Sequence, residues 1–115
     1  MKTIMMYVLL VLFTSTESGP EILGTWLIPD ENVKVEITCD GDVCTGVVVK
    51  APKDVIIGKE ILRDLKERNG KWKGKFYAIR KDKLLNAELN PNGDELDVEV
   101  SAGLGSKSFT WTRVD

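Results

Sequence analysis

The stretch VKVEITCDGDVCTGVVVK, residues 33–50, decides the fold. Its first half alternates apolar and polar residues with a period of two, which is the pattern of a strand with one buried face and one face in water. Gly41 and Asp42 follow, and this pair is typical of a two-residue hairpin turn. With that turn as the loop, Cys39 faces Cys44 across the two strands. The stretch therefore predicts an antiparallel hairpin that brings the two cysteines together.

Cys39 and Cys44 are the only cysteines of the chain, and their placement predicts one disulfide at the strand pair beside the turn. A redox pair would normally be two residues apart at a helix start. A zinc site would need more soft ligands, and the chain has no histidine. A calcium site at Asp40 and Asp42 is not supported, because the oxygen ligands there do not have the spacing of a calcium-binding loop. A disulfide belongs to an oxidising compartment, so we expect a secreted or periplasmic protein.

The N-terminus supports export. Lys2 precedes an apolar run over residues 4–13, and small and polar residues follow up to Gly19. This is the layout of a secretory signal peptide, which we place at residues 1–18. The apolar run is shorter than the roughly 20 residues that span a bilayer. Residues 19–115 are then expected to form a single β-barrel domain, with no transmembrane segment after cleavage of the signal.

Period-two alternation and turn residues recur along the rest of the chain, and they predict eight strands. These are residues 24–28, 33–38, 44–50, 60–67, 71–80, 84–89, 94–101 and 107–114. The short connections leave no room for crossover helices, so we expect an all-β antiparallel meander that closes into a roughly eight-stranded, lipocalin-like barrel. The segment near 58–68 also fits a short helix, because Ile57, Ile61 and Leu65 would share one helical face. We favour the strand.

Four pieces of the sequence, taken in order, resemble a bacterial family of exported small domains, domain of unknown function family 2147. The resemblance spans residues 22–114, although Thr45 stands where that family has a Cys-Gly step. It implies export and a β fold, and it implies no activity. The four pieces are Gly24-Thr25-Trp26, Cys44-Thr45-Gly46-Val47-Val48, Gly70-Lys71-Trp72-Lys73-Gly74-Lys75-Phe76-Tyr77 and Thr110-Trp111-Thr112-Arg113-Val114.

Gly24, Trp26 and Arg113 give a looser resemblance to lipocalin-type barrels. Those barrels begin with Gly-x-Trp and carry an arginine on the last strand that lies over the tryptophan. The resemblance implies that these three residues close the barrel, where the first strand meets the last. A guanidinium stacked on an indole contributes about 0.5–2 kcal/mol.

The inward-facing aromatic residues allow two interpretations. Eight strands is the size at which a barrel interior is either just filled or holds one small ligand. Large aromatic side chains fill the core by default, but the same residues could line a partly open cavity. They are Trp26, Trp72, Phe76, Phe109 and Trp111.

The distribution of charges argues against a nucleic-acid partner. The net charge is −2, with acidic and basic residues interleaved, so nucleic acid is not an expected partner. One local basic stripe could attract an anionic envelope polymer or lipid headgroups, but we favour a solvated face balanced by acidic residues across the sheet. The stripe consists of Lys71, Lys73, Lys75, Arg80, Lys81 and Lys83, and the balancing residues are Glu88, Glu95, Asp97 and Glu99.

Nothing in the sequence indicates catalysis. The chain lacks histidine, the usual general base, and the candidate acids lie in predicted turns or on wet faces. These acids are Asp30, Glu31, Asp40, Asp42, Asp54 and Glu60. We therefore expect no enzyme, no cofactor and no metal. The favoured hypothesis is an exported barrel that binds a small apolar or amphipathic ligand. The alternative is a structural or interaction module of the bacterial cell envelope, with a filled core and a surface partner.

Overall fold

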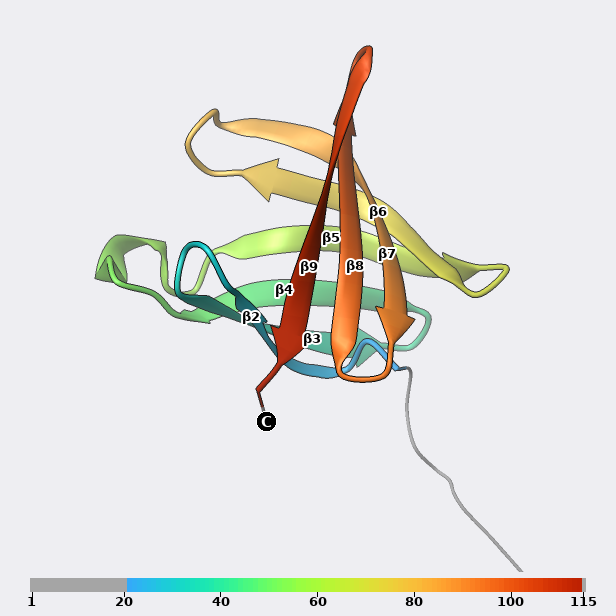
Figure 1. Cartoon of the computed structure of the whole chain (residues 1–115), viewed down its shortest axis with the longest axis horizontal. Coiled ribbons are helices and arrows are strands. Elements are labelled where there is room, and N and C mark those ends of the chain that lie inside the picture. Colours follow the sequence, from blue (N-terminus) through green and yellow to red (C-terminus); the bar gives the residue numbers. More distant parts are fainter. Residues whose placement is uncertain (1–20, 115) are drawn as a thin grey trace, which may run out of the picture.

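The computed structural model describes residues 21–114, so the predicted signal peptide lies outside the described residues. The described chain is an antiparallel meander in which each strand pairs with its neighbour in sequence, and pairing of the first strand with the last closes the barrel (Figure 1). The predicted all-β class and the eight-stranded barrel are confirmed. The strands are β2 (Gly24–Ile28), β3 (Val33–Asp40), β4 (Val43–Lys50), β5 (Glu60–Arg68), β6 (Lys71–Ala78), β7 (Lys83–Asn92), β8 (Glu95–Ala102) and β9 (Gly105–Arg113).

The β3–β4 hairpin has the predicted register. Cys39 is paired with Cys44 beside the Gly41–Asp42 turn, and their Cα atoms are 4.0 Å apart. The two sulfur atoms form a disulfide, as predicted. Cys44 is fully buried, while Cys39 is half-buried.

The segment for which a helix was the alternative is strand β5, so the strand interpretation is confirmed. An irregularity in its pairing with β6 lies between Arg63 and Lys66, and within it Asp64 adopts a positive φ of 56°. This β-bulge inserts one extra residue on β5 and returns Leu65 to the interior, three positions after Leu62. A three-residue spacing between buried positions imitates a helical pattern, which explains the ambiguity in the sequence.

Some strand ends differ from the sequence prediction. β7 continues to Asn92 through Pro91, which was expected to lie in a turn. The pairing of β6 with β7 ends at Trp72 and Leu89. Pro91 therefore has no neighbouring strand on that side, and the N–H that proline lacks costs the sheet no hydrogen bond there. β6 ends at Ala78 rather than at residue 80. A short 3-10 turn, η1 (Asp54–Ile56), lies in the β4–β5 connection and was not predicted.

The connections alternate between the two ends of the barrel. The β3–β4, β5–β6 and β7–β8 turns lie at one end, which we call the closed end. The β2–β3 turn, the β4–β5 connection with η1, the β6–β7 turn and the β8–β9 turn lie at the other, which we call the open end. In Figure 1 the β8–β9 hairpin rises at the top, and β8 and β9 cross β3, β4 and β5 at a steep angle.

Candidate functional site: an apolar cavity at the open end

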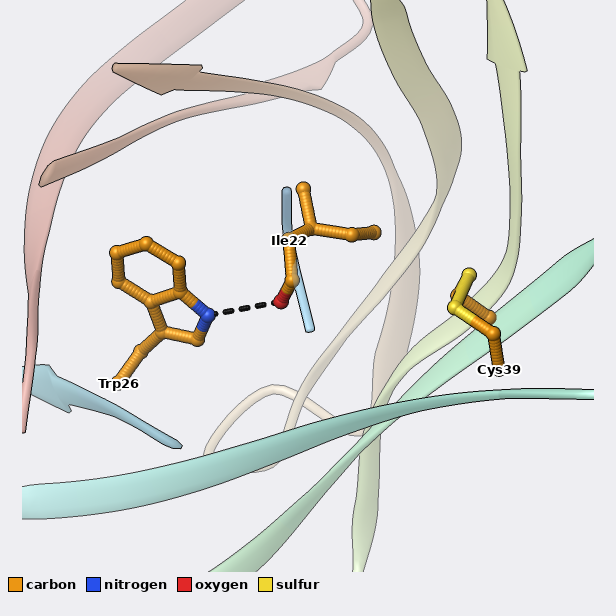
Figure 2. Close-up of a disulfide and its surroundings, with 4 residues drawn as sticks. Ile22, Trp26 and Cys39 are labelled. Carbon is orange, nitrogen blue, oxygen red and sulfur yellow. Dashed lines mark hydrogen bonds between the residues drawn. A yellow bond between two sulfur atoms is a disulfide. The ribbon is translucent and has the colours of Figure 1, made fainter. Parts of the chain in front are cut away.

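The interior towards the closed end is packed. Trp26 is fully buried, and its Nε1–H donates a hydrogen bond of 2.9 Å to the carbonyl oxygen of Ile22 (Figure 2). That bond satisfies the only polar group of the indole, so the ring adds apolar area to the core without an unpaired donor. The other core side chains that do not border the cavity described below are Val35, Ile37, Cys44, Leu62, Leu65, Trp72, Ala87, Leu89 and Leu96.

Arg113 lies at the seam between β2 and β9. It is opposite Trp26 in the strand register, and its guanidinium carbon is 4.3 Å from the centre of a Trp26 ring. Nη1 donates to the carbonyl oxygen of Leu23 at 2.7 Å, and Nη2 donates to that of Glu21 at 2.8 Å. Arg113 therefore joins the last strand to the segment that precedes the first.

Gly24 sets the chain direction at the same seam. Its φ of 128° lies in a region that side chains with a Cβ rarely adopt. The bend brings Ile22 back over the barrel interior, where its carbonyl meets the Trp26 indole. The structure thus places Gly24, Trp26 and Arg113 together at the seam.

The disulfide is expected to make a moderate contribution to stability, because it closes a loop of only about six residues. Loop-closure entropy then gives about 2 kcal/mol. Urea unfolding of the Cys39→Ser/Cys44→Ser variant should show this loss in the free energy of unfolding, with an unchanged far-ultraviolet spectrum. Failure of the variant to fold would instead assign the disulfide an essential role in forming the barrel.

Towards the open end, the interior holds a cavity of about 980 Å³ that opens to solvent. This volume lies at the upper end of the range of about 300–1,000 Å³ that is common for ligand pockets. Three of the four connections of the open end contribute to its border, together with the adjoining ends of β8 and β9. The apolar lining residues are Ile28, Val33, Val48, Pro52, Val55, Ile56, Ile61, Phe76, Ala78, Ile79, Leu85, Val98, Val100, Ala102, Phe109 and Trp111.

Three of the aromatic residues predicted as possible lining do border this cavity: Phe76, Phe109 and Trp111. Trp111 is 2% exposed and lies where the packed core meets the cavity. Trp72 does not border it, because its side chain belongs to the packed core between β5 and β7. Trp26 is likewise part of the packed core. The aromatic residues thus divide between the two interpretations that the sequence left open.

Among the buried residues of the cavity wall, only Trp111 carries a polar side-chain atom, its indole N–H. Among residues 21–114, no polar or charged residue is buried. At the mouth, in contrast, two apolar side chains are exposed to solvent: Val55, on η1, is 78% exposed, and Phe109, on β9, is 44% exposed. An apolar group entering the cavity would remove both the wall and these mouth residues from water, which is favourable.

Charged residues border the mouth unevenly. The cations come from the β4–β5 connection, the β6–β7 turn and strand β9, whereas both bordering carboxylates lie on the β2–β3 turn. The cations are Lys53, Arg80, Lys81 and Lys107, and the carboxylates are Asp30 and Glu31. In residues 21–114, none of these four cations takes part in an ion pair or a side-chain hydrogen bond.

The basic stripe of the sequence therefore divides into two parts. On the outer wall, Lys71 and Lys73 lie 3.5 Å and 3.8 Å from the carboxylate oxygens of Glu88, and Lys75 donates to the side-chain oxygen of Asn86 at 2.6 Å. Arg80 and Lys81 instead border the mouth. Of the expected balance across the sheet, only the pairing of Lys71 and Lys73 with Glu88 is found within residues 21–114.

The β6–β7 turn that carries Arg80 and Lys81 is fixed by a backbone hydrogen bond and by side-chain contacts of Tyr77. The backbone N–H of Lys81 donates to the Ala78 carbonyl at 3.1 Å. The Tyr77 hydroxyl donates to the Asp82 carboxylate, and this hydrogen bond is the main reason that the pKa of Tyr77 is raised above its usual value. Arg63 lies 5.0 Å from the centre of the Tyr77 ring. The turn is thereby fixed to the end of the β-strand that precedes it.

The six candidate acids do not converge on one site. Asp30 and Glu31 lie at the open end, on the β2–β3 turn, and Asp40 and Asp42 lie at the opposite end, on the β3–β4 hairpin. Asp54 begins η1 and Glu60 begins β5. Within residues 21–114, no three side chains suited to binding a metal ion come together. No helix in this part of the chain has the length and the apolar character needed to cross a bilayer.

Sequence reasoning missed most of the cavity wall and its charged border. Val55 and Ile56 lie outside the strands, in a connection whose apolar and polar residues do not alternate. Ile79 and Arg80 were assigned to the end of a strand rather than to a turn. The available signal was the apolar run Val55-Ile56-Ile57 in an otherwise polar connection.

Fold and cavity together define the class: a small closed antiparallel β-barrel, packed at one end and hollow at the other. No protein-family model matches the chain, and neither a curated protein nor a solved structure matches it. Its function is therefore argued from the cavity itself.

Proposed function

We propose that this protein is an exported, non-enzymatic barrel that binds a small apolar or amphipathic molecule in its open end. The observation that carries the proposal is the cavity of about 980 Å³, with its apolar wall and with Val55 and Phe109 exposed at its mouth. Large apolar side chains at the mouth of an apolar cavity are the arrangement expected of a binding site for such a molecule.

Export rests on separate support. The predicted signal peptide over residues 1–18 and the Cys39–Cys44 disulfide both suit a secreted or periplasmic protein. The resemblance to a bacterial family of exported domains points the same way. A ligand encountered there would be a molecule of the cell envelope or of the surroundings.

The alternative function, a structural or interaction module of the cell envelope, has one observation in its favour. Leu104, at the tip of the β8–β9 hairpin, is fully exposed. A partner protein could cover it. The cavity of about 980 Å³ weighs against the filled core that this alternative assumes.

Filling the cavity should abolish binding. Ala78 is half-buried and borders the cavity at the end of β6, so Ala78→Trp places an indole in the open space without displacing packed core. We expect binding of the neutral fluorescent probe N-phenyl-1-naphthylamine to weaken by about tenfold or more. The measurement is a fluorescence titration, accompanied by a melting curve to verify that the variant folds.

Lys75→Trp is the matched control, because it adds the same side chain at an outward-facing position of the same strand. Its probe affinity should equal that of the unmodified protein. If the unmodified protein does not bind the probe, or if Ala78→Trp binds it as tightly, the cavity is not a binding site and the proposed function is wrong.

A further inference from the structure

We infer that the occupant of the cavity is a single-chain anionic amphiphile, with its chain inside the barrel and its headgroup at the cationic part of the mouth. We call Lys53, Arg80, Lys81 and Lys107 the cationic rim. The inference rests on the proposed function, because it specifies the chemistry of the ligand that the cavity takes.

The wall determines which part of a ligand can enter. No polar or charged residue is buried anywhere in residues 21–114, and among the buried residues that line the cavity only Trp111 has a polar side-chain atom, its indole N–H, so the depth of the cavity has no set of side chains that could replace water around a charged headgroup. Placing an unpartnered polar group there would be unfavourable, whereas a methylene chain would gain from leaving water. A ligand with a polar group must therefore keep that group at the mouth.

The mouth determines the charge of that group. The cationic rim contributes four positive charges against the two carboxylates of Asp30 and Glu31. Those carboxylates share one turn, so the β4–β5 connection, the β6–β7 turn and β9 present a positive surface to a bound headgroup. The rim cations form no ion pair and no side-chain hydrogen bond within residues 21–114, so they are available to a carboxylate or a phosphate.

Arg80 and Lys81 are the centre of this surface. They are adjacent on the β6–β7 turn, whose backbone is held by hydrogen bonds from Lys81 to Ala78 and from Asp82 to Ile79. The nearest acid in sequence, Asp82, accepts the hydroxyl hydrogen bond of Tyr77 and does not pair with either cation. A guanidinium on a fixed turn can make two parallel hydrogen bonds to one carboxylate or phosphate group.

The test is displacement of N-phenyl-1-naphthylamine by four twelve-carbon amphiphiles below their micelle concentrations: dodecanoate, dodecyl phosphate, dodecanol and dodecyltrimethylammonium. At low salt we expect both anions to bind about tenfold more tightly than the alcohol, and the cation more weakly. The advantage of the anions should shrink as sodium chloride rises, because exposed charges are screened. Shortening the chain should weaken binding by about fourfold for each methylene removed. Whichever of dodecanoate and dodecyl phosphate binds more tightly indicates whether the natural headgroup is a carboxylate or a phosphate.

Two double variants with the same change in charge test the position of the headgroup. Arg80→Gln/Lys81→Gln removes two rim charges, and Lys71→Gln/Lys73→Gln removes two charges from the outer wall, where both lysines face Glu88. The first should reduce the advantage of dodecanoate over dodecanol by about fivefold and leave dodecanol unaffected. The second should leave both affinities unchanged.

Three outcomes would overturn the inference: equal affinities for anion and alcohol, equal losses in the two double variants, or an affinity that does not depend on chain length. If the neutral probe binds and the anions show no advantage, only the headgroup assignment fails. If the neutral probe does not bind, the proposed function fails with it.

Discussion

Arg113→Ala is expected to lower the free energy of unfolding by about 3 kcal/mol. The guanidinium stacks on Trp26 at 4.3 Å and donates charged hydrogen bonds to the carbonyls of Leu23 and Glu21. Charged hydrogen bonds contribute about 1.5–3 kcal/mol each and the stacking about 0.5–2 kcal/mol. The sum is reduced because Glu21 is exposed and its carbonyl can be rehydrated. Urea unfolding, monitored by tryptophan fluorescence, gives the value.

The control for Arg113→Ala is Arg68→Ala, which removes the same side chain from an exposed position at the end of β5 and should change stability little. Arg113→Lys keeps the charge but cannot reach two carbonyls with a planar fork, so its stability should fall between those of the unmodified protein and the alanine variant. A midpoint for Arg113→Ala equal to that of the unmodified protein would show that this contact does not hold the seam.

Gly74→Ala is expected to cost about 3 kcal/mol or more, through a clash with the backbone of the β5 bulge. A Cβ at Gly74 would lie 2.5 Å from the carbonyl oxygen of Arg63 and 2.9 Å from that of Asp64. These atoms belong to a hydrogen-bonded sheet and cannot rotate away as a side chain can. The measurement is the shift of the thermal midpoint together with the free energy of unfolding.

Two further glycine variants calibrate this result. Gly105→Ala has no atom within 4 Å of the added Cβ and should leave stability unchanged or slightly raised. Gly46→Ala meets only the Leu62 side chain, at 2.8 to 3.1 Å, so its cost should be intermediate. If Gly74→Ala were as stable as Gly105→Ala, the β5 bulge would have to be more adaptable than its close contact with β6 implies.

The barrel could be predicted from the sequence because most of its strands carry a simple alternation. The residues that decide it, such as those of the Cys39–Cys44 hairpin, depend only on neighbours in the sequence. β5 was ambiguous because its bulge at Asp64 depends on the close approach of Gly74, a residue on another strand. A single strand read alone cannot show where its partner leaves room for a bulge.

The cavity could be predicted only in outline. Phe76, Phe109 and Trp111 were recognised as inward-facing, but nothing local distinguishes them from Trp72, which is in the packed core. The distinction depends on how far each residue lies from the two ends of the barrel, and this is a property of the whole sheet. The cationic rim was hidden for a related reason, since its members come from separate parts of the chain that meet only at the mouth.

The meander has a consequence for the order of folding. Seven of the eight strand pairings join neighbours in sequence, so they can form one after another with short loops to close. The pairing of β2 with β9 joins the two ends of the chain, through only two registered residue pairs. The chain can therefore assemble a curved open sheet strand by strand, and its interior becomes an enclosed compartment only when the last strand docks.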